Sequence, residues 1–208
     1  MRSPALDHLV YAVPELTSGI EDLYRLLGVR AERGGRHVGF GTHNALLGLG
    51  GGAYLELIAP DPSQPIPPVS QFIGFDAASL PRLAGWAART DDIEAAVAKA
   101  REAGFDPGPI LEMSRLRPDG VTLAWRLTWP LGEGGGLIPF LIDWGDSPHP
   151  SATAPEGVIL RSLVVEYPEP QVLAAVLGAL EVDVSIVAGA RPALVATLDA
   201  CGTTVVLR

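Results

Sequence analysis

Apolar and polar residues alternate along residues 6–13 (LDHLVYAV), and a short amphipathic stretch follows directly. Leu6, Val10 and Ala12 share the parity of His8, and the residues of opposite parity are also largely apolar. Apolar residues on both faces are typical of a strand that is buried on both sides. The pattern therefore predicts a buried strand that carries one histidine.

A helix is predicted immediately after this strand. Its apolar residues recur at helical spacing, and Gly28 stands where a left-handed residue ends many helices. Ser18 and Glu21 have the spacing of a capping box, although Thr17 could be the cap instead. Glycines then separate three expected strands, at residues 37–40, 42–49 and 53–59.

The same order of elements returns twice. The second copy has a strand at 83–90, a helix capped by Asp91 or Asp92 that ends at Gly104, and strands near 110–115, 121–130 and 137–144. The third and shorter copy has a strand at 158–166, a helix at 169–180, and strands at 182–187, 193–198 and 203–207. Aligning the strand-to-helix junctions places Gly85 opposite His8 and Ser162 opposite Gly85, at equal intervals.

Two proline-rich connectors divide these copies, at residues 61–81 and 147–155. Prolines at this density stop helices and central strands, so both segments are expected to be linkers. The first also has the P-x-x-P spacing of an SH3-type ligand. We therefore expect an α+β protein with paired βαβββ modules at 1–60 and 82–146, which form one domain over 1–146, and a third, partial βαβββ module at 156–208.

The composition limits the partners of this protein. A formal net charge of −9 and a pI near 4.8 argue against nucleic acid or an anionic membrane as a partner. Cys201 is the single cysteine and cannot form an internal disulfide. No uncharged apolar run is long enough to cross a bilayer, and the chain starts without a signal-peptide core. We expect a cytoplasmic protein with a small-molecule partner.

The arrangement resembles the vicinal oxygen chelate superfamily, and within it the glyoxalase-like group, which shares the glyoxalase, bleomycin-resistance and dihydroxybiphenyl-dioxygenase fold. The resemblance rests on residues 6–10 (LDHLV), a helix ending in 26–28 (LLG), residues 54–58 (YLELI) and residues 90–97 (TDDIEAAV). It implies that the paired modules curl into a half-open, curved, mixed sheet. It also implies a divalent metal (Zn, Ni, Fe or Mn) held by the first and last strands of each module.

Transferring the metal-ligand positions of this superfamily to the present sequence gives an incomplete set of ligands. His8 and Glu56 match the two positions of the first module, whereas the second module has Gly85 at its histidine position. Its last strand offers Leu141 or Asp143, depending on the register, so Asp143 is a candidate third ligand. A catalytic metal needs about three protein ligands. Alternatively, His8 and Glu56 form a buried hydrogen-bonded pair.

Several other side chains are candidates for ligand contacts. Arg126 lies in an apolar run and, like Arg89, could anchor a carboxylate; it could equally pair with Asp143 or Glu112. Asn44 and Trp86 are further candidates for contacts to the substrate. Two histidines of the glycine-rich stretch, His37 and His43, either complete a coordination set or lie in surface loops. The tryptophans of the second module are expected in the core, where one or two could line a pocket: Trp86, Trp125, Trp129 and Trp144.

The resemblance implies a protein that acts on or binds a small oxygenated organic molecule, by metal-assisted lyase, isomerase or dioxygenase-type chemistry. In this interpretation His8 and Glu56 are the catalytic residues, and Glu56 moves a proton. The competing interpretation is a metal-free binding or sequestering protein of the bleomycin-resistance type, which Gly85 at a ligand position favours. The third module could serve to pair two subunits into a homodimer.

Overall fold

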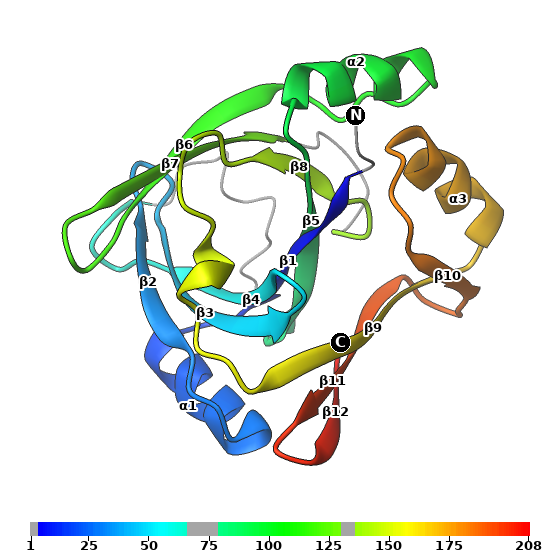
Figure 1. Cartoon of the computed structure of the whole chain (residues 1–208). Helices are drawn as coiled ribbons and strands as arrows, with labels where there is room; N and C mark the ends of the chain where they lie inside the picture. Colours follow the sequence, from blue (N-terminus) through cyan, green and yellow to red (C-terminus); the bar gives the residue numbers. More distant parts are fainter. Residues whose placement is uncertain (1–3, 66–78, 130–135) are drawn as a thin grey trace.

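The computed structural model describes residues 4–65, 79–129 and 136–208. Eight strands close into a barrel in the order β1-β4-β3-β2-β6-β7-β8-β5, and a separate four-stranded sheet lies alongside it (Figure 1). The protein is therefore a mixed α+β molecule dominated by strongly curved sheet. Among the predicted linker residues 61–81, residues 66–78 lie outside the part of the chain that is described.

The first half of the barrel consists of one helix and four strands. Apolar spacing predicted α1 correctly, but its cap is Glu15, whose carboxylate accepts hydrogen bonds from the backbone N–H groups of Thr17 and Ser18. The predicted Ser18–Glu21 capping box is wrong, because the helix begins earlier. The elements are β1 (Ala5–Ala12), α1 (Leu16–Leu27), β2 (Glu32–His37), β3 (Thr42–Gly50) and β4 (Ala53–Pro60).

The second half repeats this order of elements. Asp92 caps α2 by accepting a hydrogen bond from the N–H of Ala95, which was one of the two predicted caps. The elements are β5 (Arg82–Arg89), α2 (Ile93–Glu102), β6 (Ile110–Leu116), β7 (Thr122–Thr128) and β8 (Phe140–Asp143). Residues 130–135, between β7 and β8, lie outside the described part of the chain.

The two halves meet along two seams. β1 pairs antiparallel with β5, and β2 pairs antiparallel with β6 through Arg36–Leu116 and His37–Arg115. The half-open sheet expected from the sequence is therefore closed in this structure. Closure leaves one face of every strand pointing into the barrel, where its side chains meet those of the opposite wall.

The C-terminal strands have the predicted order along the chain but a different pairing. They are β9 (Val158–Tyr167), α3 (Pro170–Ala179), β10 (Ser185–Ala188), β11 (Ala193–Ala200) and β12 (Thr203–Leu207), after a short 3-10 turn, η3 (Pro150–Ala152). The sheet order is β10-β9-β11-β12, whereas in the first half of the barrel β1 pairs with β4. The C-terminal unit thus differs in sheet topology from the two units that form the barrel.

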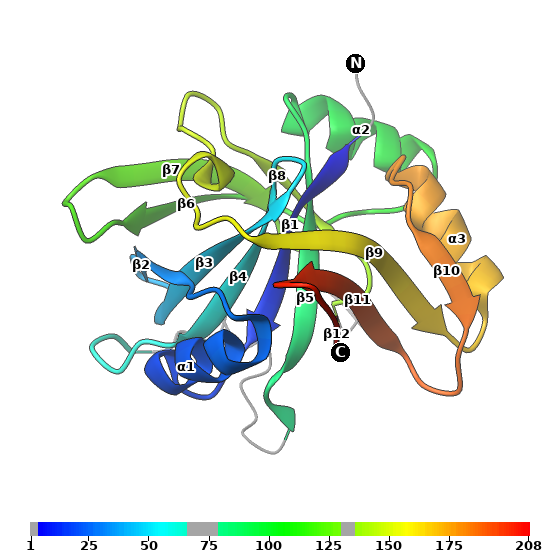
Figure 2. The ribbon, with the colours of Figure 1, turned by 60° about the horizontal axis from the view of Figure 1, so that its bottom comes forward.

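Two hydrophobic clusters divide the barrel wall into an outer and an inner side. The outer cluster joins Leu9 of β1 and Leu55 of β4 to α1, and it includes Val165 and Leu198 of the C-terminal sheet. The inner cluster fills the barrel and contains three of the four tryptophans. Figure 2 also shows the C-terminal sheet beside the barrel, with α3 next to β10 at its margin. Within the described residues, none of the helices has the length and apolarity needed to traverse a bilayer.

Candidate functional site

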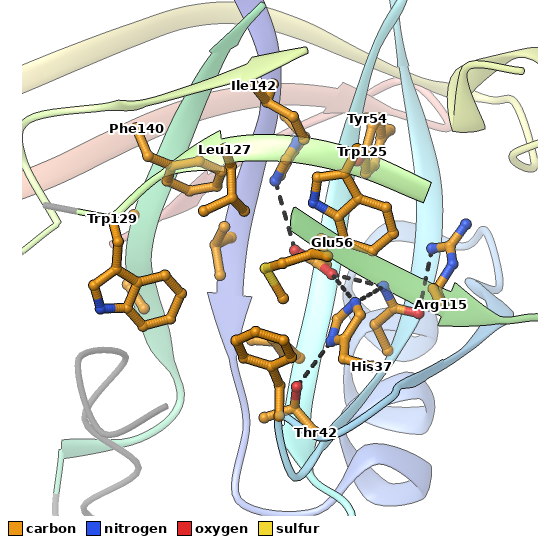
Figure 3. Close-up of a pocket in the computed structure, with 18 of the residues that line it drawn as sticks. His37, Thr42, Tyr54, Glu56, Arg115, Trp125, Leu127, Trp129, Phe140 and Ile142 are labelled. Carbon is orange, nitrogen blue, oxygen red and sulfur yellow. Dashed lines mark hydrogen bonds and ion pairs between the residues drawn. The ribbon is translucent and has the colours of Figure 1, made fainter. Parts of the chain in front are cut away.

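A cavity of about 70 Å³ lies inside the barrel, and its wall is polar on one side and aromatic on the other (Figure 3). The polar side chains come from β1, β2, β3, β4 and β6, which lie next to one another around the barrel. These residues are His8, His37, Thr42, Asn44, Tyr54, Glu56 and Arg115. The aromatic wall is formed by Phe40, Trp125, Trp129, Phe140 and Trp144.

A β-bulge in β1 shapes the first part of this site. Leu6 pairs with Ala88 and His8 with Ala87, so Asp7 is an extra residue in β1. Successive strand residues normally point to opposite faces, but a bulge re-aims the side chains around it. Here the carboxylate of Asp7 reaches Nδ1 of its neighbour His8 at 2.7 Å. The bulge therefore forms a buried carboxylate–imidazole pair from two adjacent residues.

Asp7 is completely buried and is surrounded by donors. Besides His8, Nε2 of His149 lies 2.8 Å away and Nε1 of Trp144 donates at 3.1 Å. Burial alone would raise the pKa of Asp7, but the hydrogen bonds from His149 and His8 outweigh it and hold the pKa well below its usual range. An ionised carboxylate only accepts hydrogen bonds, so Nδ1 of His8 carries its proton and Nε2 faces the cavity.

Glu56 lies at the centre of the polar wall. Its Oε2 is 3.6 Å from Nε2 of His8, and its Oε1 is 3.5 Å from Nε2 of His37. Nδ2 of Asn44 donates to Oε1 at 2.6 Å, and Tyr54 stacks on the imidazole of His8 with 4.7 Å between ring centroids. The hydrogen bond from Asn44 thus fixes the carboxylate of Glu56 at Oε1, and Oε2 is directed toward His8.

His37 is held neutral by its surroundings. Burial lowers its pKa to about 4, and the charge of Arg115 acts in the same direction, while Glu56 opposes them. Because Nδ2 of Asn44 is a donor, Nε2 of His37 accepts its hydrogen bond at 3.3 Å, and Nδ1 donates to the hydroxyl of Thr42 at 2.8 Å. His37 therefore orients Asn44 and carries no charge near neutral pH.

The candidate residues from the sequence divide into two groups. His8, Glu56 and Asn44 line the cavity together. Arg126 and Asp143 form an ion pair at 2.7 Å outside the cavity, because Ile142 is the residue of β8 that points inward and its neighbour points away. The sequence did not single out four further residues at this site. Tyr54 and Arg115 line the cavity, whereas Asp7 and His149 lie behind His8, outside the cavity wall.

Arg89 and Trp86 also lie away from the cavity wall. The Nε atom of Arg89 is 3.9 Å from the carboxylate of Asp7, and Arg89 is not among the residues that line the cavity. Trp86 belongs to the outer hydrophobic cluster, and its indole N–H donates to the backbone oxygen of Leu137 at 2.7 Å. The predicted substrate contacts of Arg89 and Trp86 therefore have no support in this geometry.

The side chains present do not fit the predicted metal. The second half of the barrel presents Gly85, Phe140 and Ile142 to the cavity, and none of them can coordinate an ion. Within the described residues, no three His, Cys, Asp or Glu side chains are arranged to hold a metal. Asn44 already occupies Oε1 of Glu56, between the carboxylate and His37. These residues therefore do not form the metal site that the resemblance implies.

Comparison with known proteins assigns this chain to a defined family. A family model described as a glyoxalase-like domain matches residues 6–181. The chain belongs to this glyoxalase-like family of the vicinal oxygen chelate superfamily, which confirms the resemblance seen in the sequence. A comparison with curated proteins finds no match.

Solved structures are similar to this chain at low sequence identity, and one of them shares its fold. A hypothetical protein from Staphylococcus aureus is 15% identical, with a TM-score of 0.67 over 98% of this chain and 84% of that protein. Methylmalonyl-CoA epimerase from Mycobacterium tuberculosis is 21% identical, with a TM-score of 0.43 over 71% of this chain and 91% of the epimerase. A methylmalonyl-CoA epimerase in complex with methylmalonyl-CoA and NH4+ is 17% identical, with a TM-score of 0.45 over 72% and 100% of the two chains.

Proposed function

We propose that this protein is an enzyme that binds a small oxygenated organic molecule inside the barrel and transfers a proton on it through Glu56. One observation carries this proposal. Among the described residues that line the cavity, Glu56 is the single carboxylate, and it lies between two imidazoles at 3.6 and 3.5 Å. A positioned carboxylate in a largely apolar cavity is a common arrangement for general acid–base catalysis.

The proposed step is removal of a proton from a carbon next to a carbonyl group. The C–H bond breaks, its electron pair moves into an enolate, and Oε2 of Glu56 takes the proton. In the form of His8 that carries protons on both ring nitrogens, Nε2 donates a hydrogen bond to the enolate oxygen, no proton is transferred there, and the carboxylate of Asp7 stabilises the imidazolium through Nδ1. Return of the proton to the same carbon or to its neighbour gives epimerisation or isomerisation.

The cavity limits the size and the character of the ligand. An engineered cavity of about 150 Å³ holds benzene, so 70 Å³ admits a reacting group of only a few heavy atoms. The aromatic wall of Trp125, Trp129 and Phe140 favours an apolar substituent beside the oxygenated group. This supports a short ketone, hydroxyketone or oxo acid rather than a polar sugar.

Hydrogen exchange tests the proposal before any product is known. We expect the protein in D₂O to exchange the α-hydrogen of at least one compound in a panel of small ketones, hydroxyketones and 2-oxo acids, as measured by proton NMR. Glu56→Gln should slow this exchange by about 10²-fold or more and leave ligand binding intact. The control is Glu112→Gln, because Glu112 is an exposed acid on β6 outside the cavity. Equal exchange in Glu56→Gln and in the wild-type protein would refute the role of Glu56.

A metal-free binding protein is the second candidate function. The five aromatic side chains that line one wall favour it, since such walls hold planar or apolar ligands without chemistry. Tight ligand binding with no α-hydrogen exchange across the panel would favour this function over catalysis.

A further inference from the structure

Arg115 is a buried cation whose charge is not balanced by a carboxylate. Its side chain lies in β6 and is 4% exposed. Within the described residues, the side chain makes one hydrogen bond, a long one of 3.4 Å from Nη1 to Oδ1 of Asn44, and its Nε has no partner. Arg126 and Arg89, by contrast, each lie within ion-pair distance of an aspartate.

The surroundings of Arg115 leave room for a ligand. Arg115 lines the inner cavity and also a second cavity of about 250 Å³, whose wall includes Arg33 and Arg117 together with Glu32 and Asp119. Gly34 is adjacent, and a Cβ there would lie 2.8 Å from Nη1 of Arg115. The missing side chain lets the guanidinium and the amide of Asn44 approach the backbone of β2 closely at the edge of the second cavity.

An unbalanced buried charge is unfavourable unless a partner of opposite sign binds to it. Burial lowers the pKa of Arg115, which reflects the same lack of compensation, although Glu56 and Tyr54 act in the opposite direction. The guanidinium is planar and presents a fork of N–H groups that matches a carboxylate.

We infer that Arg115 is an anion-binding site and that the natural ligand of the protein brings an oxyanion, in the simplest case a carboxylate, to this guanidinium. The inference goes beyond the proton transfer at Glu56, because binding alone tests it. The oxyanion belongs either to the molecule in the inner cavity or to a separate anion in the second cavity, and the two sources share the same chemistry.

Matched acids and amides test this site. Propionate should bind the wild-type protein more tightly than the isosteric propionamide, by a factor on the order of ten, as measured by calorimetry or ligand-detected NMR. Arg115→Gln should abolish this preference, and Arg115→Lys should keep part of it, since it retains the charge but loses the fork. Arg126→Gln is the matched control: it removes the same charge from the neighbouring strand and should keep the full preference.

Stability gives an independent readout of the same variants. Because the charge of Arg115 is uncompensated in the free protein, Arg115→Gln should melt at the same or a higher temperature than the wild-type protein. Propionate should raise the melting temperature of the wild-type protein and of Arg126→Gln, but not that of Arg115→Gln. Competition between propionate and propionamide would place the carboxylate in the inner cavity, whereas simultaneous binding would indicate a separate anion.

Three results would overturn the inference. The first is equal affinity of the wild-type protein for acid and amide, and the second is an acid preference that survives in Arg115→Gln. The third is no detectable binding of propionate, acetate or inorganic phosphate at millimolar concentration. A preference lost in Arg126→Gln instead would assign the anion to the ion-paired arginine.

Discussion

Asn44 connects the polar side chains of the cavity to one another. Its two N–H groups donate to Glu56 and His37, and its oxygen accepts from Arg115. Each of these partners restricts the rotation of the amide, so the orientation of Asn44 follows from the network. The position of the proposed general base therefore depends on an uncharged residue.

His37 should make the stability of the protein depend on pH. Its pKa is about 4 in the folded protein and near 6.5 in the unfolded chain, so between these values the unfolded chain binds more protons. The stabilisation is present above pH 6.5 and is lost as the pH falls toward 4, by about 3 kcal/mol in total. Denaturant unfolding between pH 7 and 4 should show this loss, and His37→Gln should reduce it.

The control for this measurement is His43→Gln. Burial also lowers the pKa of His43, but the side chain lies outside the inner cavity and is far less buried. This variant should keep most of the pH dependence. An unchanged pH dependence in His37→Gln would contradict the assignment.

Some of the candidate residues from the sequence line the cavity and others do not, for a simple geometric reason. His8 and Glu56 were identified because the first and last strands of a module carry the site in this family, and both line the cavity. In β8, the two candidate positions Leu141 and Asp143 lie on the same face of the strand, and neither lines the cavity. Ile142, on the other face, points inward. A strand pattern with apolar residues on both faces does not reveal which parity faces the cavity.

At the level of elements, the bulge in β1 and the turn η3 cooperate in placing His8. The bulge brings Asp7 beside His8, and His149, immediately before η3, binds the other oxygen of the same carboxylate. Nδ1 of His149 in turn accepts from the backbone N–H of Ser151. The connector between barrel and C-terminal sheet thus contributes to the site, which its proline-rich sequence did not indicate.

Asp7→Asn should reduce α-hydrogen exchange by about 10²- to 10⁴-fold and leave the fold intact. The amide can donate to Nδ1 of His8, which would move the imidazole proton to Nε2 and remove the stabilisation of the imidazolium. The ¹⁵N chemical shifts of His8 report this change of tautomer, which a purely structural role would not produce. His149→Gln should have a smaller effect, on the order of tenfold, because two donors to Asp7 remain. Loss of activity with an unchanged tautomer would contradict this positioning role.

Most element boundaries followed from the sequence, and the main exception is β2. It spans Glu32–His37 rather than residues 37–40. Gly34 and Gly35 interrupt the apolar pattern and predict a break, but here glycine is needed for close approach: a Cβ on Gly35 would lie 2.1 Å from the backbone oxygen of Leu116. The glycines therefore mark the seam where β2 meets β6, which no local pattern could show.

In the whole molecule, the C-terminal sheet shares its core with the barrel. Leu198 and Val165 belong to the same cluster as Leu9 and Leu55, and backbone hydrogen bonds join Leu83 to Arg208 and Gly48 to Pro155. The sequence predicted separate units at 1–146 and 156–208. This division stays a prediction, and the shared core leads us to expect that the two parts unfold together.

Leu198→Ala should test this cooperativity. The side chain is fully buried in the C-terminal sheet, so its truncation should cost about 2–5 kcal/mol. All four tryptophans lie in the second half of the barrel, so their fluorescence reports barrel unfolding. We expect Leu198→Ala to lower the fluorescence midpoint and the circular dichroism midpoint together. Val206→Ala, at an exposed position of the same sheet, should change neither. An unchanged fluorescence midpoint in Leu198→Ala would indicate two independent domains.

The extra residue in β1 also restricts how this chain can diverge. A one-residue deletion there would regularise the ladder with β5, and it would turn every side chain on one side of the deletion to the other face. Relatives that retain an acid before the histidine should therefore retain the length of this strand. Those that lose the acid should lose the irregular ladder with it, so that the two traits are inherited together.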